Sequence, residues 1–308
     1  MINRTLIRIK VLQIVYAYCQ KNGADLNGAE KELTRSLQKS YELYHYLLLL
    51  ISVLIDAEQK KLDALQYKFL PTEEDRNPNF RLANNRLAEQ LQINEAMRKF
   101  VNRHGVFWID EHQGFIRNLL NVILQSDIYK DYLESPDTYE SDQEFLRKAF
   151  KTIILESVEL PDILEERDIY WTDNLDIIGT FVLKTIKRLD PAKGPQQELL
   201  PMFRNEEDRR FAVRLLHRSI LEQEENVGLI NKQIQNWDLE RIASIDLYIM
   251  QIALAEIKNF PSIPVSVSLN EYIDLARYYS TPKSGVFING ILDSIVTELK
   301  NEGKLFKN

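Results

Sequence analysis

Two arginines near the start of the chain, Arg4 and Arg8, are the residues best suited to gripping a ligand. They lie four positions apart in residues 3–20, NRTLIRIKVLQIVYAYCQ, where the apolar spacing predicts a helix, so both project from one side of it. A guanidinium is planar and always charged, and two at the rim of a packed face suit phosphates or bases. The residues alone favour a structural alternative, in which both arginines cap a helical bundle or pair with acids at its end.

Motifs for covalent or metal chemistry are absent from the sequence. The four histidines are dispersed, with no HExxH pair and no neighbouring cysteine: His45, His104, His112 and His217. No GxSxG, P-loop or GxGxxG motif occurs. The tryptophans are most simply core or interface anchors: Trp108, Trp171 and Trp237. We therefore expect neither an enzyme nor a cofactor or metal site.

Composition predicts an all-α protein. The 308 residues include only ten glycines and ten prolines, and no stretch alternates apolar and polar residues as a strand would. The single cysteine, Cys19, cannot form an internal disulfide, which fits a reducing compartment. The apolar run 46–55 is far shorter than the roughly 20 residues that span a bilayer, and no signal segment is evident. We expect a soluble cytoplasmic protein without a membrane association.

The formal net charge of −7 is unevenly distributed. Residues 134–168 contain eleven acids and four bases, whereas residues 1–24 contain four bases and no acid. Electrostatic fields decay over about 8–10 Å at physiological salt, so the local charge decides whether a phosphate backbone can bind. The overall charge therefore excludes extensive nonspecific nucleic-acid binding but allows a small RNA site away from residues 134–168.

Apolar spacing predicts most of the helices. After the first helix, helical patterns occupy 40–65, 81–102, 109–124, 142–155, 171–189, 205–235 and 242–257. Asn205 is placed to cap its helix, and Ser268 with Glu271 forms a possible capping box. Gly290 sits in a helical pattern where it costs about 1 kcal/mol relative to alanine, so we expect it to allow a close helix contact.

Several motifs in order resemble the NusB family of bacterial transcription antitermination factors. They are Trp237-Asp-Leu-x-Arg-Ile-x-x-Ile-Asp246, Pro264-x-x-Val-x-Leu-Asn-Glu-x-x-x-Leu-Ala276 and Phe287-Ile-Asn-Gly-Ile-Leu-Asp293. The first helix, with its basic start and its Leu-Gln-x-x-Tyr at residues 12–16, is similar to the first helix of that family. A typical member is about half as long as this chain, and residues 205–235 look like its third helix.

The resemblance implies a NusB-like helical bundle enlarged by additional helices, and an RNA-binding function without covalent catalysis. A member of this family is expected to bind boxA-type single-stranded RNA together with NusE, a ribosomal protein, and to help assemble an RNA polymerase antitermination complex. Matching the family's positions gives these RNA-binding residues: Arg4, Arg8, Asp246, Lys283, Phe287 and Asn289. Phe287 could instead belong to the core. Family positions that are often basic are occupied here by Leu247, Gln251, Gly285 and Val286, and Lys283 restores one charge.

The expected organisation has three parts. Residues 1–29 carry the first NusB-like helix, residues 30–203 form an enlarged helical region, and residues 204–308 form the C-terminal NusB-like module. The enlarged region is either a degenerate second module, because Trp and Asp precede a buried helix at 170–189 as they do after 236, or a set of helices that merely look alike.

Two other functions fit the sequence. The chain could be a helical protein-binding scaffold without RNA activity, or a detached NusB-like domain of an rRNA-modifying system. For the antitermination function, we expect NusE to contact the outer faces of 246–258 and 270–279, and we expect the acidic segment 134–168 not to contact RNA.

Overall fold

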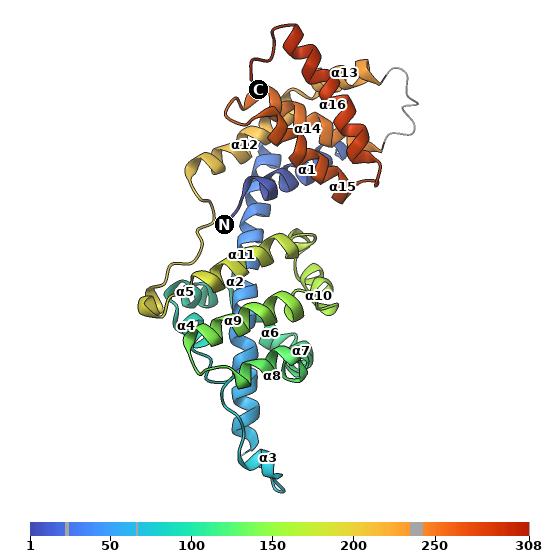
Figure 1. The fold of residues 1–308 in the computed structure, drawn as a ribbon. Helices are drawn as coiled ribbons and strands as arrows, with labels where there is room; N and C mark the ends of the chain where they lie inside the picture. The colour runs from blue at the N-terminus through green and yellow to red at the C-terminus, as the bar shows by residue number, and fades with distance from the viewer. Residues whose placement is uncertain (22–24, 66, 235–242, 308) are drawn as a thin grey trace. The chain divides into compact units, whose positions relative to one another are not determined.

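The chain folds into helices throughout the part that the computed structural model describes, which is residues 1–308 except 22–24, 66, 235–242 and 308 (Figure 1). Sixteen α-helices and three short turns of 3₁₀ or π geometry account for the regular structure of these residues. Their one extended pairing is an isolated parallel bridge between Ile2 and Phe203. The predicted all-α class is confirmed.

The chain divides into two compact units. Unit 1 comprises Met1 and Gln38–Met202, and unit 2 comprises Ile2–Leu37 and Phe203–Asn308. The helix α2 (Leu26–Leu65) contributes residues to both, since the unit boundary falls inside it. The domain boundaries expected from the sequence, at residues 30 and 204, remain a prediction.

Unit 1 is built around the second half of α2. Nearly every residue from Leu43 to Ile55 is buried, and a helix that is buried on all sides must be surrounded by others. The other helices of this unit are α4 (Arg86–Ile93), α5 (Glu95–His104), α6 (Phe107–Asp110), α7 (Gln113–Gln125), α8 (Asp127–Glu134), α9 (Tyr139–Ala149), α10 (Glu159–Arg167) and α11 (Leu175–Arg188). The short helix α3 (Glu73–Arg76) lies beyond the C-terminal end of α2 (Figure 1).

Hydrogen bonds fix α2 to its neighbours in unit 1. The indole of Trp108 in α6 donates to the carbonyl of Tyr46 at 2.9 Å, and that of Trp171 donates to the carbonyl of Lys39 at 2.8 Å. Both indole side chains are buried, which confirms them as core anchors; Trp237 lies outside the described residues. By length and hydropathy α2 could cross a membrane, but 78% of its most apolar window is buried inside the protein, as in a core helix.

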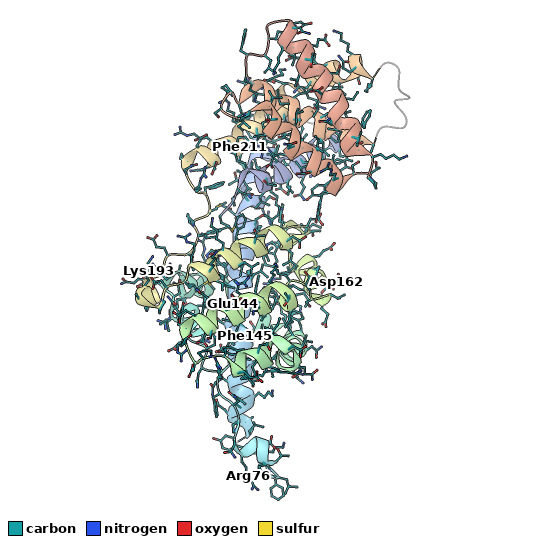
Figure 2. All side chains as sticks on the ribbon, in the orientation of Figure 1. Arg76, Glu144, Phe145, Asp162, Lys193 and Phe211 are labelled. Carbon is teal, nitrogen blue, oxygen red and sulfur yellow. The ribbon has the colours of Figure 1, made fainter. Side chains whose placement is uncertain are left out.

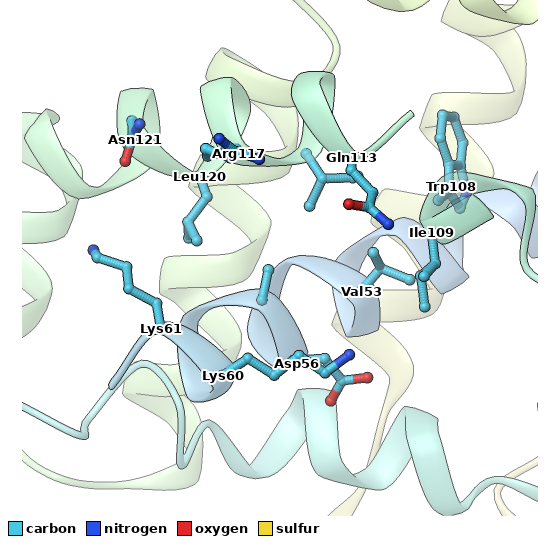
Figure 3. A pocket seen from close by; sticks show the side chains of 12 residues that line it. Val53, Asp56, Lys60, Lys61, Trp108, Ile109, Gln113, Arg117, Leu120 and Asn121 are labelled. Atoms are coloured by element: carbon cyan, nitrogen blue, oxygen red, sulfur yellow. The ribbon is translucent and has the colours of Figure 1, made fainter. Parts of the chain in front are cut away.

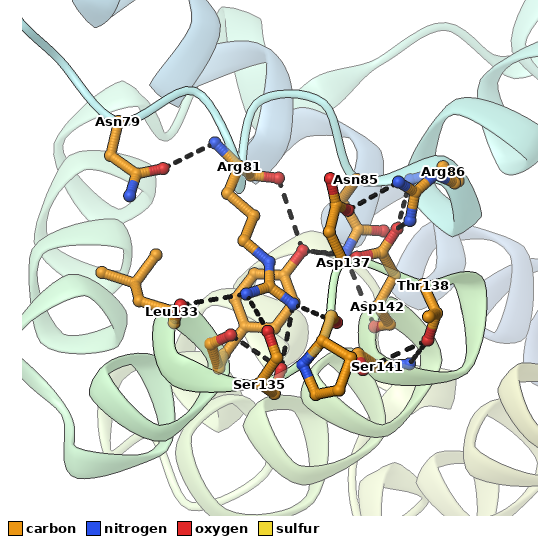
Figure 4. A network of polar contacts seen from close by, with 12 residues as sticks. Asn79, Arg81, Asn85, Arg86, Leu133, Ser135, Asp137, Thr138, Ser141 and Asp142 are labelled. Carbon is orange, nitrogen blue, oxygen red and sulfur yellow. Dashed lines mark hydrogen bonds and ion pairs between the residues drawn. The ribbon is translucent and has the colours of Figure 1, made fainter.

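The turn before α4 is tied to the end of α8 through one arginine (Figure 4). Arg81 donates to the carbonyls of Leu133, Ser135 and Pro136 at 2.6–3.0 Å, and its guanidinium lies 4.3 Å from the ring centroid of Tyr132. The last carbonyls of a helix lack partners within the helix, so this side chain satisfies groups that α8 leaves open.

On the next helix, α9, Phe145 is buried in the core while Glu144 is exposed (Figure 2).

Unit 2 surrounds one central helix, α14 (Ser244–Asn259), whose residues from Ile249 to Ile257 are all buried. Five helices pack against it: α1 (Arg4–Gln20), α12 (Glu206–Leu221), α13 (Gln223–Gln233), α15 (Val265–Tyr279) and α16 (Ser284–Asn301). Asn205 caps α12 by accepting from the amide of Asp208 at 2.9 Å, so this predicted cap is confirmed.

Three local predictions are wrong. The pattern at 205–235 is not one helix, because it is interrupted at Glu222 between α12 and α13. Ser268 does not cap a helix: it lies inside α15, and its hydroxyl donates to a buried carboxylate. Gly290 is exposed with no atom near its missing Cβ, and the close contact in α16 occurs at Gly285, whose Cβ position lies 3.3 Å from Arg277 Cγ.

Candidate nucleic-acid interface

Arg8 lies in the core of unit 2. Its Nε and Nη2 each donate to a carboxylate oxygen of Glu256 at 2.8 Å, and Nη1 lies 3.0 Å from Glu271. The hydroxyls of Ser268 and Tyr272 also donate to Glu256, at 2.7 and 2.9 Å. The Arg8 side chain is 2% exposed and that of Glu256 is 0% exposed. The expectation that Arg8 projects from a rim is therefore wrong, because its guanidinium neutralises a buried acid of α14.

The surroundings of Arg8 favour its charged form. Burial alone lowers the pKa of Arg8, but the hydrogen bonds to Glu256 and the charges around it raise that pKa above its ordinary value. Burial also raises the pKa of the Tyr272 phenol, and the neighbouring Glu256 carboxylate raises it further. A buried carboxylate needs partners for its oxygens, and Glu256 accepts four hydrogen bonds from three side chains. The group locks α1 to α14 and α15.

Arg4 lies one turn earlier and is partly exposed. Its Nη2 is 2.7 Å from Glu207, its Nε is 3.2 Å from Asp208, and its guanidinium lies 5.0 Å from the ring centroid of Phe211. These three residues belong to the first turns of α12. The structural alternative, in which the arginines pair with acids, thus describes the contacts of both, although Arg8 makes its pair in the core and not at a bundle end.

Asp246 is buried, and its carboxylate accepts a hydrogen bond from the first residue of α16. Its Oδ2 accepts from the Ser284 hydroxyl at 2.8 Å, and that hydroxyl in turn lies 2.8 Å from the Thr281 hydroxyl. The carboxylate therefore holds the N-terminus of α16 in place. Because Asp246 is buried, its carboxylate is not placed for direct contact with a ligand.

The start of α16 carries the other three predicted residues. Lys283 is the exposed residue before the helix, Asn289 is exposed within it, and Phe287 is only partly exposed beside the buried Ile288. Asp246 thus contacts the first turn of α16, on which or beside which Lys283, Phe287 and Asn289 lie, although positions 287 and 289 face different sides of the helix. Arg4 and Arg8 instead join α1 to α12, α14 and α15.

An exposed face of unit 2 that is rich in arginine lies on α12, and sequence reasoning missed it. An open groove of about 660 Å³ runs along this helix. It is lined by one acid, one histidine and four arginines, with two apolar residues: Glu206, His217, Arg209, Arg210, Arg214, Arg218, Val213 and Leu221. Arg210 is 80% exposed and Arg209 is 66% exposed, and their distances to Glu206 are as long as 3.9 and 3.8 Å.

The signal for this face was present in the sequence. Positions 209 and 210, 213 and 214, and 217 and 218 recur at the spacing that places residues on one side of a helix. Arginines clustered along one helix face are the electrostatic footprint of a nucleic-acid binding surface. Three acids at 206–208, which favour the positive end of the helix, precede these arginines and lower the net charge of the segment. In the described part of the chain, no group of three or more His, Cys, Asp or Glu side chains is placed to hold a metal ion.

Comparisons with known proteins point to one family. A sequence model described as the NusB family matches residues 181–297. A transcription antitermination protein NusB from Salinibacter ruber is 34% identical over 132 residues, which cover 41% of this chain and 82% of that protein. One from Koribacter versatilis is 43% identical over 99 residues, covering 32% of this chain and 68% of that protein. No solved structure matches significantly.

Proposed function

Because this chain belongs to the NusB family, we propose that it is a transcription antitermination factor that binds boxA-type RNA jointly with NusE. In this function the chain acts in the cytoplasm as a component of an RNA polymerase antitermination complex. The match to relatives that are named transcription antitermination proteins carries the proposal. No step of it requires covalent catalysis or a cofactor.

Unit 2 is the part that performs this function in our proposal. The family match extends over 181–297, and α1 supplies the buried Arg8 that Glu256 requires. The N-terminal residues and the C-terminal helices therefore form one module, with residues 38–202 as an insertion into it.

The RNA interface combines exposed cations with one aromatic ring. Lys283, Phe287 and Asn289 offer a charge, a stacking surface and an amide that can bond base edges, which are the groups that read single-stranded RNA. The guanidiniums of α12, with the partly exposed Arg4, would hold phosphates of the strand. Arg8 and Asp246 act as positioning residues, since both are buried and hold helices that carry the exposed groups.

NusE would bind the exposed face of α15. Its outward residues recur at helical spacing: Val267, Asn270, Asp274 and Tyr278. The central helix α14 contributes little to such a surface, because most of it is buried. The acidic segment 134–168 belongs to unit 1 and carries exposed carboxylates such as Asp162 (Figure 2), so RNA crosslinks are expected to avoid it.

Fluorescence anisotropy with labelled boxA RNA tests the proposal. The full chain should bind boxA RNA more tightly than a scrambled RNA, and NusE should increase the difference. Changing Arg209, Arg210 and Arg218 together to Gln should make the slope of log affinity against log salt shallower by about 2, at roughly 0.7 per phosphate contact on a single strand.

A matched variant supplies the control. Gln at the exposed residues Arg98, Lys99 and Arg103 of α5 removes the same charge from unit 1, and its salt slope should equal that of the parent. Equal affinity for boxA and scrambled RNA, with and without NusE, would contradict the proposal. NusE binding without any RNA binding would instead favour the protein-binding scaffold.

A further inference from the structure

Unit 1 contains a groove between the second half of α2 and the helices α6 and α7 (Figure 3). Its volume is about 540 Å³. Twelve residues line it, six of them apolar: Val53, Ala57, Trp108, Ile109, Ile116 and Leu120, with Asp56, Lys60, Lys61, Gln113, Arg117 and Asn121. None of them belongs to the interface proposed for RNA.

Apolar and charged residues alternate along the groove, and Lys61 lies at one end of it. On α2 the lining residues follow helical spacing, from Val53 at one end of the groove to Lys61 at the other. On α7 they likewise run from Gln113 to Asn121. Figure 3 shows Val53 near Ile109 at one end, while the Lys61 amino group lies at the end where Asn121 is found.

The rim of the groove carries an excess of positive charge. Lys60, Lys61 and Arg117 are all exposed cations. The one acid in the lining, Asp56, accepts a hydrogen bond at 2.7 Å from Gln92 of α4, and burial raises the pKa of its carboxyl group. Lys61 also lies 3.2 Å from Glu58, which is buried outside the lining. An anion entering the groove would therefore meet three cations and one lining acid, with Glu58 beside Lys61.

The volume of the groove fits a small molecule better than a helical segment of a partner protein. Small-molecule sites typically occupy about 300–1,000 Å³ and are mostly apolar with a few placed polar groups. A helix about 10 Å in diameter would fill 540 Å³ with roughly 7 Å of its length, little more than one turn at about 5.4 Å per turn. So short a contact would not hold a partner helix.

We propose that this groove binds a small organic anion with an extended apolar body. The body lies against Val53, Ile116 and Leu120, and the anionic head lies between Lys61 of α2 and Arg117 of α7. The site gives the inserted unit a binding activity of its own, separate from RNA. It requires no chemistry beyond apolar burial and charge pairing.

A pair of fluorescent probes tests the site in the full chain. Anilinonaphthalene sulfonate has an apolar aromatic body with one negative charge, and phenylnaphthylamine has a similar body without charge. We expect the anionic probe to bind at one saturable site, and more tightly than the neutral probe. Lys61→Gln with Arg117→Gln should weaken the anionic probe about fivefold and leave the neutral probe within about twofold, since exposed charge pairs are individually weak.

Two further variants make the result decisive. Ala57→Phe fills the groove and should abolish saturable binding of both probes. Lys99→Gln with Arg103→Gln removes two exposed cations of α5, outside the groove, and should leave both affinities unchanged. The proposal is overturned if the anionic probe binds several equivalent sites, or if the charge variant retains the parent affinity. Equal weakening by the α5 variant would overturn it as well, because the effect would then be one of overall charge.

Discussion

The buried ion pair of unit 2 gives the sharpest prediction. Replacing Arg8 by Ala removes two guanidinium bonds from the Glu256 carboxylate, which is 0% exposed. Among the described residues, the hydroxyls of Ser268 and Tyr272 then remain as its hydrogen-bond donors. Breaking a buried pair by removing one partner costs about 3–5 kcal/mol, because an uncompensated charge stays in the core. For a domain of this size the corresponding fall in Tm is about 10 °C.

Two measurements check this magnitude. Urea unfolding followed by circular dichroism gives the change in free energy, and hydrogen exchange of the α14 amides reports on unit 2 by itself. A double variant, Arg8→Met with Glu256→Leu, should recover about half of the loss or more, because it removes both charges from the core. Arg4→Ala should cost less than about 1 kcal/mol, since Arg4 is 29% exposed and one of its partners, Glu207, is 67% exposed.

The result also decides between two roles of Arg8. If Arg8→Ala weakens RNA binding while the free energy of unfolding changes by less than about 1 kcal/mol, the reasoning from burial is refuted and Arg8 contacts RNA directly. If stability falls as expected, any loss of RNA binding should be restored in the Arg8→Met, Glu256→Leu double variant. Such recovery would separate a positioning residue from an RNA contact.

Three further predictions concern unit 1 and α16. Arg81→Ala, which removes the carbonyl contacts at the end of α8, should destabilise the protein by about 2–4 kcal/mol in urea unfolding. Burial lowers the pKa of His45, so below pH 6.5 the unfolded state binds a proton more readily than the folded state does. The free energy of unfolding should therefore fall as the pH drops below 6.5. Thermal melts across pH should show that His45→Gln removes this dependence. Gly290→Ala meets no atom and should stabilise by about 1 kcal/mol, whereas Gly179→Ala places a Cβ 2.7 Å from Leu155 Cδ2, so the end of that side chain must move and the gain in Tm should be smaller.

The local features of the fold could be predicted from the sequence. Apolar spacing and composition predicted the all-α class, and the Asn205 cap follows from its own residue type and its neighbours. Helix interruptions were harder to predict. The pattern 81–102 is divided by Asn94, whose side chain accepts from the amides of Ala96 and Met97 and so begins a new helix.

Long-range pairing could not be predicted in this way. Arg8 and Glu256 are 248 positions apart, and spacing along the chain indicates only which residues share a helix face. One signal was present: Glu256 is the only acid in the apolar run QIALAEI, and a carboxylate in a fully buried helix requires a cationic partner. Arg8 has the same character, since apolar residues flank it in the first helix.

The fold of unit 1 lowers the free-energy cost of inserting residues 38–202 into unit 2. An unstructured insert as long as residues 38–202 would cost roughly 4.5 kcal/mol of loop closure, from three-halves of RT times the logarithm of its length. Unit 1 instead holds its own ends together: the Tyr41 hydroxyl donates to the Leu200 carbonyl at 3.0 Å, and the Leu200 amide donates to the Tyr44 hydroxyl at 3.2 Å. Because folding of unit 1 fixes where its chain leaves and returns, unit 2 need not bear that closure cost.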